Sequence, residues 1–275
     1  GQARLTILPV DQNALVRCED LEAAIEPATI LVSIMHANNE VGVVQPIAAF
    51  ARICRENGVL FHTDASQSFL KTPIDMDAWG IDLLTVSGHK VHGPKGVGAL
   101  AMKKGVCLTP LLHGGDHESG LRSGTPNVAA IAGFGVSVSR YTNEELVRIA
   151  VLREQLVRGL NEAFPNLRKH GWAVAQVPTI VNIGIAGWTG KDLAKALDQK
   201  GLLVSASSAC HATLLTPSHV LKAMGQSDHE ADAALRISLG RFTTSENITT
   251  LLRVIVEVTT MDRDQIPSRA QEVSR

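Results

Sequence analysis

The sequence predicts an α/β fold in which helices cover a mostly parallel sheet. Short apolar runs alternate with stretches of helical periodicity along the 275 residues, and this alternation is typical of layered α/β proteins. Aromatic residues make up only 4% of the chain, so aliphatic side chains must form the core, as they do around buried parallel strands. Two of the apolar runs end in polar residues, and open α/β sheets bind their ligands at the carboxyl ends of strands.

Five short apolar runs in the first part of the chain are expected to be strands. They lie near residues 5–10, 30–35, 59–62, 83–87 and 97–102. The helical stretch from about Asn127 to Phe164 is long, and we expect it to be interrupted and to join two domains. After it we expect a strand over 179–185, a helix capped by Thr189, a helix beginning near Pro217 and a last helix from about Glu246.

The segment 87–96 contains a lysine, Lys90, in a glycine-rich turn at the end of the apolar run 81–86. Glycines let another chain or a ligand approach the backbone closely, and desolvation or a nearby charge can remove the proton of a lysine there. This pattern is typical of the Schiff-base lysine in pyridoxal phosphate enzymes. A solvated basic turn is the alternative interpretation.

A second apolar run ends in the polar segment 62–67, which contains Asp64 and Gln67. Because both runs end in polar residues, Asp64 and Lys90 are expected to face one crevice. A carboxylate there can keep a pyridine nitrogen protonated, which makes pyridoxal phosphate an electron sink. The alternative for Asp64 is the N-cap of a helix.

Two later segments carry further candidate residues. The β-like segment 202–211 contains Cys210, which is either an exposed nucleophile or an inert thiol. In the segment 234–244, strand alternation puts Arg236 and Ser238 on one face, and an arginine fork suits the carboxylate of a substrate.

Composition disfavours several other classes of protein. The net charge of −1 gives no reason to expect nucleic acid or an anionic membrane as a partner, and no apolar stretch of 18 residues or signal peptide is present. Four cysteines without a Cys-x-x-Cys pair, and histidines without ligand spacing, predict no disulfide scaffold and no metal site. Cys54 follows apolar residues on a predicted helix face and is expected in the core. The expected location is cytoplasmic, with organellar import left open.

Six motifs resemble those of a known protein family in sequence and in their order along the chain. They are the segments 35–42, 62–67, 87–90, 122–127, 208–210 and 235–244. The chain resembles the cysteine desulfurases and selenocysteine lyases. These enzymes depend on pyridoxal phosphate, have fold type I and belong with the class V aminotransferases. The resemblance implies a three-layer large domain over 1–135 and, over 136–275, a linking helix and a smaller α+β domain that carries the cysteine loop.

The resemblance also implies how pyridoxal 5'-phosphate would be held. Lys90 would carry the cofactor covalently, Asp64 would pair with its pyridinium nitrogen, and Gln67 would bond to its phenolic oxygen. Ser87 and His89 would bind the phosphate.

Other residues would serve the dimer and the substrate. Thr125 would reach the phosphate from the neighbouring subunit of a homodimer. Asn39 would lie beside the cofactor and the substrate, Arg236 would bind the substrate carboxylate, and Cys210 would accept the sulfur.

The function implied is conversion of L-cysteine to L-alanine, with the sulfur held as a persulfide on Cys210. An acceptor or scaffold protein, for example in iron-sulfur cluster assembly, would then take the sulfur. The Ala-Cys-His junction at 209–211 also resembles selenocysteine lyases, so L-selenocysteine is an alternative substrate.

The chain departs from the family at its beginning. Residues 1–10 resemble a strand about a hundred residues inside a typical member, so the usual N-terminal third, with a Gly-Thr phosphate turn and a ring-stacking histidine, is missing. We therefore expect a fragment or a processed chain. A catalytically incomplete interaction or scaffold module is the alternative from another class.

Overall fold

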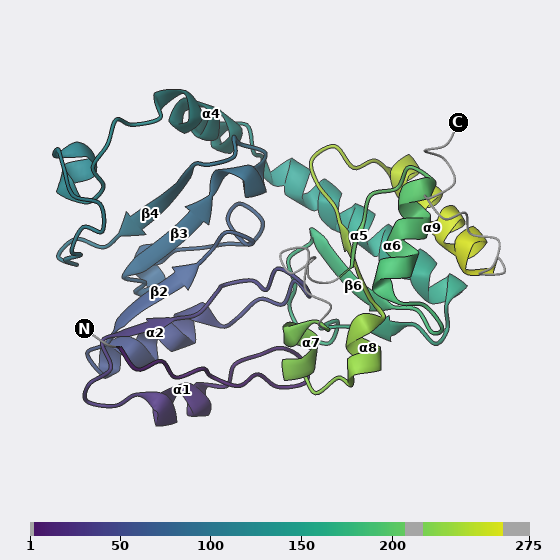
Figure 1. Ribbon diagram of the computed structural model, residues 1–275, viewed down its shortest axis with the longest axis horizontal. Helices are drawn as coiled ribbons and strands as arrows, with labels where there is room; N and C mark the ends of the chain where they lie inside the picture. Colours follow the sequence, from purple (N-terminus) through teal and green to yellow (C-terminus); the bar gives the residue numbers. More distant parts are fainter. Residues whose placement is uncertain (1–2, 207–216, 261–275) are drawn as a thin grey trace, which may run out of the picture. The chain divides into compact units, whose positions relative to one another are not determined.

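The computed structural model describes residues 3–206 and 217–260, and the chain forms two compact units (Figure 1). The first unit comprises Gly1–Pro9, Val16–Asn38 and Val44–Thr142. The second comprises Val10–Leu15, Asn39–Val43 and Asn143–Arg275. The short segment Asn39–Val43 therefore belongs to the second unit, although the residues on both sides of it belong to the first.

A four-stranded sheet forms the centre of the first unit. Its strands are adjacent in the order β1 (Leu31–Ser33), β2 (Leu60–Asp64), β3 (Leu83–Ser87) and β4 (Gly98–Met102). The pairs β1–β2 and β2–β3 are parallel, and β4 pairs with β3 in the antiparallel direction. All four strands were predicted at these places, β1 with longer bounds.

The predicted strand at residues 5–10 is wrong. None of these residues is assigned to a strand, and the side chains of Leu5 and Ile7 are 81% and 83% exposed. The segment has the alternating apolar pattern of a strand, but it pairs with no other strand among the described residues. Pairing with a neighbour, which the pattern cannot report, decides whether such a segment becomes a strand.

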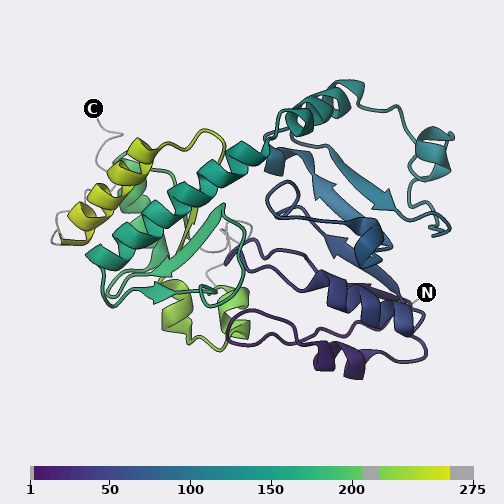
Figure 2. The same cartoon turned by 180° about the vertical axis from the view of Figure 1, so that it is seen from behind.

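The helices of the first unit are α1 (Cys18–Ala24), α2 (Ile47–Glu56), α3 (Met76–Trp79) and α4 (Val128–Ser139), with the 3₁₀ turns η1 (Gly88–Val91) and η2 (His117–Gly120). Three of the helices, α1, α2 and α3, pack in one cluster with the sheet, and α4 packs against the turn η1 (Figure 2). The helix α2 begins directly after Pro46, and its residues Phe50 and Cys54 are fully buried in one cluster with Phe61 of β2. The predicted core position of Cys54 is confirmed.

The second unit combines an antiparallel sheet with helices. In chain order its elements are α5 (Asn143–Ala163), β5 (Arg168–Lys169), β6 (Ile180–Gly184), α6 (Gly190–Gln199), β7 (Ser205–Ala206), α7 (His219–Ala223), α8 (Asp228–Asp232), β8 (Ala234–Ser238) and α9 (Ser245–Thr260). The strand order is β5-β6-β8-β7. The predicted interruption of the long helical stretch is confirmed, because α4 ends at Ser139 and α5 begins at Asn143. The Thr189 side chain accepts the Asp192 amide and caps α6, as predicted.

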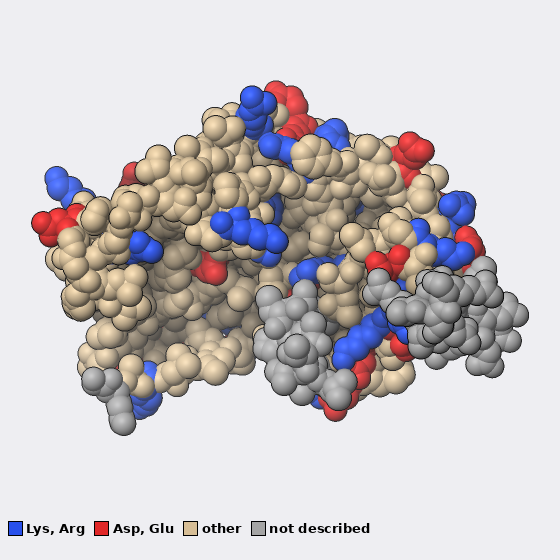
Figure 3. All heavy atoms as spheres, turned by 45° about the horizontal axis from the view of Figure 1, so that its top comes forward, with Lys and Arg blue, Asp and Glu red and all other residues tan. Residues whose placement is uncertain are grey.

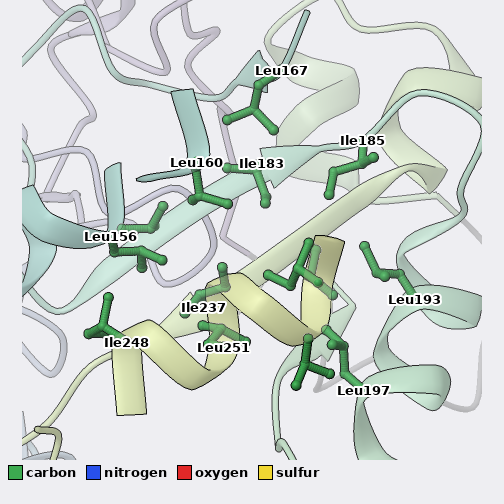
Figure 4. Packing of buried hydrophobic residues seen from close by; sticks show 14 of the residues in the cluster. Leu156, Leu160, Leu167, Ile183, Ile185, Leu193, Leu197, Ile237, Ile248 and Leu251 are labelled. Atoms are coloured by element: carbon green, nitrogen blue, oxygen red, sulfur yellow. The ribbon is translucent and has the colours of Figure 1, made fainter. Parts of the chain in front are cut away.

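The core of the second unit lies between its sheet and the helices α5, α6 and α9 (Figure 4). Leu156 and Leu160 of α5 and Leu197 of α6 are fully buried, as is Ile183 of β6. The side chain of Leu251 from α9 belongs to the same cluster. Burial of aliphatic side chains of this kind stabilises a protein by about 1.5 to 3 kcal/mol each, so this cluster holds the helices against the sheet.

The surface carries charges of both signs. Figure 3 shows Lys and Arg interspersed with Asp and Glu over the face in view. No helix among the described residues is long and apolar enough to span a bilayer. Across the same residues, no three His, Cys, Asp or Glu side chains gather as a metal site would require.

Candidate functional site

One face of the first sheet carries a row of polar side chains. The strand register aligns Ser33 with His62, and Asp64 with Thr85. The imidazole of His62 joins its neighbours, with 2.7 Å from Nδ1 to the Ser33 hydroxyl oxygen and 3.3 Å from Nε2 to the Thr85 hydroxyl oxygen. Side chains two residues apart on a strand share a face, so Asp64, at the carboxyl end of β2, lies on this same polar face.

The carboxylate of Asp64 is exposed and is held by the turn that follows it. Its Oδ1 accepts the Ser66 amide at 2.8 Å. Residues 66–70 form a turn rather than a helix, so the alternative in which Asp64 caps a helix is wrong. This Asx-type hydrogen bond fixes the carboxylate locally through Oδ1. Gln67 lies half-buried in the same turn.

The neighbouring strand β3 ends in the turn that holds Lys90. The Ser87 hydroxyl oxygen lies 2.8 Å from Nδ1 of His89, and Lys90 follows half-buried in η1. Desolvation, followed by the charges of Lys90, Lys95 and Lys71, lowers the pKa of His89. A Cβ at Gly93 would lie 2.9 Å from the Gly88 carbonyl oxygen, so this turn needs glycine to fold back on itself.

These residues fit an anionic pyridine cofactor. Hydroxyl, imidazole and ammonium donors at the end of β3 suit a phosphate, and the Asp64 carboxylate at the end of the adjacent β2 suits a cationic ring nitrogen. The first unit therefore brings together five of the predicted cofactor residues: Asp64, Gln67, Ser87, His89 and Lys90.

The second unit holds Asn39 and Arg236. Nη1 of Arg236 donates to the Asn39 carbonyl at 2.9 Å, and Nη2 lies 3.4 Å from the Ser205 hydroxyl. The segment Asn39–Val43 is fixed here because its next three carbonyls also accept hydrogen bonds. The donors are Nδ2 of Asn182 to Glu40, Nε2 of Gln176 to Val41 and the amide of Val177 to Gly42.

Two other arginines, Arg241 and Arg122, lie in the motifs 235–244 and 122–127. The guanidinium of Arg241 contacts both carboxylate oxygens of Glu145, at 2.9 to 3.0 Å, and both side chains are largely buried. Arg122 is exposed and donates to the carbonyl of Ser123. The pairing with Glu145 engages the fork of Arg241, which leaves Arg236 as the better candidate for a carboxylate ligand.

Two predicted site residues lie apart from these clusters. Thr125 is exposed in the loop that precedes α4. Cys210 and its neighbour His211 lie outside the described residues.

Sequence reasoning missed several buried polar residues, among them His36, Glu40 and Lys71. His36 is 3% exposed, contacts the ring of Trp79 edge to face, and has its pKa lowered to about 4 by desolvation. Glu40 is 1% exposed and accepts the Ser218 hydroxyl at 2.5 Å. Lys71 is 9% exposed. Only the first two lie in a motif that was singled out, and a single sequence gives no sign that a charged side chain is buried.

Comparisons with known proteins agree with the resemblance. The family model described as aminotransferase class-V matches residues 1–251. The chain is 44% identical over 250 residues to the cysteine desulfurase IscS of Pectobacterium atrosepticum, covering 89% of this chain and 61% of that protein. It is 41% identical over 269 residues to a mitochondrial cysteine desulfurase of Arthroderma benhamiae, covering 96% of this chain and 53% of that protein.

Solved structures agree as well. A NifS-like protein from Rickettsia africae superposes with a TM-score of 0.84 at 34% identity, covering 92% of this chain and 69% of the other. A structure described as SspA in complex with cysteine gives a TM-score of 0.75 at 38% identity, covering 87% and 67%. The predicted α/β fold class is confirmed. The chain spans about half to two thirds of the length of the curated relatives it matches.

Proposed function

Since this chain belongs to the class V aminotransferase family, we propose that it serves as a cysteine desulfurase that converts L-cysteine to L-alanine with pyridoxal 5'-phosphate. One observation carries the proposal. Two adjacent parallel strands of one unit lead into residues that suit this cofactor. Asp64, a carboxylate that suits the ring nitrogen, lies at the end of β2, and Lys90 follows β3 beside the phosphate donors Ser87 and His89. Relatives about 40% identical are named cysteine desulfurases.

The residues of the first unit divide the work of holding the cofactor. Lys90 would form the covalent link, Asp64 would keep the ring nitrogen protonated and Gln67 would bond to the phenolic oxygen. Ser87 and His89 would bind the phosphate, and their 2.8 Å contact with each other supports this role. When bound, pyridoxal phosphate supplies an electron sink for the bond changes at the substrate.

The residues of the second unit bind and orient the substrate. The planar fork of Arg236 takes the substrate carboxylate, and Asn39 lies beside the substrate. The bond from Arg236 to the Asn39 carbonyl supports this role because it fixes the guanidinium before substrate arrives. Once the substrate amine has displaced it, Lys90 would take the proton from the substrate Cα.

The sulfur leaves by attack of a thiolate. The Cys210 sulfur bonds to the substrate sulfur as the carbon-sulfur bond breaks, so L-cysteine and the Cys210 thiol become L-alanine and a persulfide on Cys210. An acceptor thiol or scaffold protein then takes the outer sulfur. Thr125 would reach the phosphate of the neighbouring subunit in a homodimer. We place the protein in the cytoplasm or an organelle.

The test measures two products and one covalent label. With pyridoxal phosphate and L-cysteine, the protein should release alanine and carry a persulfide on Cys210. Borohydride reduction and peptide mapping should find the pyridoxyl label on Lys90. Lys90→Ala should abolish both label and alanine, whereas Lys95→Ala, five residues away in an exposed position, should leave them unchanged. A label on Lys95 would refute the assignment.

The same assay separates the alternative functions. Alanine formed from selenocysteine without dependence on Cys210, tested with Cys210→Ser, would indicate a selenocysteine lyase. A protein that stays colourless with pyridoxal phosphate would indicate an interaction module.

A further inference from the structure

The turn after Asp64 carries a largely buried lysine. Lys71 is 9% exposed, and its backbone amide donates to the Ser68 carbonyl at 2.8 Å. The residue before it, Leu70, has φ of 60°, a left-handed conformation that is rare and costly for a bulky side chain. Lysines are almost never buried without a partner, so a backbone held in this conformation to bury one needs a physical explanation.

Lys71 has no counter-charge within residues 3–206 and 217–260. Across these residues its ammonium makes no hydrogen bond and no ion pair. The charges near it are positive. Desolvation, followed by repulsion from Lys90, lowers the pKa of Lys71 to about 8, and Lys71 in turn contributes to the lowered pKa of His89.

At neutral pH Lys71 is therefore a largely buried cation that is repelled by another cation. A pKa of about 8 keeps most of the Lys71 population protonated at pH 7. A buried, unpaired charge is costly, and a second cation nearby adds to the cost. An anion bound near Lys71, Lys90 and His89 would lower both penalties.

We propose that Lys71 is a further phosphate-binding residue of the cofactor site, where its ammonium pairs with the phosphate of pyridoxal phosphate. The proposal rests on the proposed function for the identity of the ligand. A phosphate suits the place better than a carboxylate because it carries more negative charge and three acceptor oxygens. Arg236, in the second unit, is the residue that fits the substrate carboxylate.

The first experiment compares ligands with and without a phosphate. Lys71→Met keeps the length of the side chain and removes its charge. We expect this variant to bind pyridoxal phosphate about tenfold to a hundredfold more weakly, as for loss of a hydrogen bond to a charged group. Its affinity for pyridoxal should stay within about twofold, because pyridoxal has no phosphate. Lys71→Arg should keep most of the affinity for pyridoxal phosphate.

Lys95→Met is the matched control, because Lys95 is an exposed lysine in the same group of charges around His89. It should bind both ligands like the unchanged protein. Equal losses for pyridoxal and pyridoxal phosphate in Lys71→Met would overturn the proposal, because Lys71 would then act through folding. Unchanged affinity for pyridoxal phosphate would overturn it too.

A second measurement needs no cofactor. Nuclear magnetic resonance of isotope-labelled lysine, assigned with Lys71→Met, follows the ε-methylene of Lys71 as inorganic phosphate is added. The Lys71 signal should shift and its pKa should rise, since a bound anion favours the charged form. No response to phosphate beyond that to chloride would overturn the proposal. A response in a protein that forms no alanine would leave this site standing and refute only the desulfurase activity.

Discussion

Replacement of Asn182 by Ala should loosen the segment Asn39–Val43 from the second unit. Asn182 is fully buried in β6, and its side chain makes two hydrogen bonds. Nδ2 donates to the Glu40 carbonyl at 2.9 Å, and Oδ1 lies 2.7 Å from Nδ1 of His170. Alanine would leave both partners buried, and Nε2 of His170 already lacks a partner among the described residues.

The expected loss of stability follows from the groups left behind. Each buried polar group without a partner costs about 1 to 3 kcal/mol. Two such groups, with a small cavity in a fully buried position, give an expected loss of about 3 kcal/mol in the free energy of unfolding. The loss should be concentrated in the second unit, which contains all three residues.

Urea unfolding followed by tryptophan fluorescence measures the effect, because Trp172 donates to the Asn182 carbonyl and Trp188 lies in the same core. Asn166→Ala is the matched control at an exposed position and should change stability by less than about 0.5 kcal/mol. A loss below about 1 kcal/mol in Asn182→Ala, with an unchanged denaturant slope, would show that the Glu40 and His170 contacts do not hold this segment.

Three further changes test other parts of the structure. Burial lowers the pKa of His36 to about 4, so between pH 6.5 and 4 the unfolded chain binds this proton and the folded protein does not. The free energy of unfolding should therefore fall by about 1.4 kcal/mol for each unit that the pH is lowered through this range. Urea midpoints of His36→Gln should fall less steeply over the same range. Arg236→Lys should raise the apparent cysteine constant about tenfold to a hundredfold in steady-state kinetics without changing cofactor absorbance, and normal cysteine affinity would contradict the role of Arg236. Gly190→Ala should lower the free energy of unfolding by at least about 1 to 3 kcal/mol, because the new Cβ would lie 1.9 Å from the Ala234 carbonyl oxygen. The control Gly135→Ala in α4 places a Cβ with nothing within 4 Å, so it should raise the thermal unfolding midpoint.

The polar residues that follow β2 and β3 could be predicted from the sequence, because the apolar run and the turn residues after it are neighbours in the chain. The runs that end at Asp64 and Lys90 are short and apolar, and the neighbouring glycines and polar residues mark where each strand stops. The same local reasoning placed Thr189 at the start of α6 and Cys54 in the core. It failed for residues 5–10, where the local pattern is that of a strand but no partner strand pairs with it among the described residues.

The sequence by itself determined the α/β class, the places of most strands and helices, and the residue types that suit a pyridoxal phosphate site. Only the tertiary structure decided which of these residues share a sheet face, that Arg241 is engaged by Glu145, and that Lys71 is buried beside Lys90. The physical reason is the range of the interactions. Strand and cap signals act over a few neighbouring residues, whereas burial and ion pairing depend on segments that are far apart in the chain.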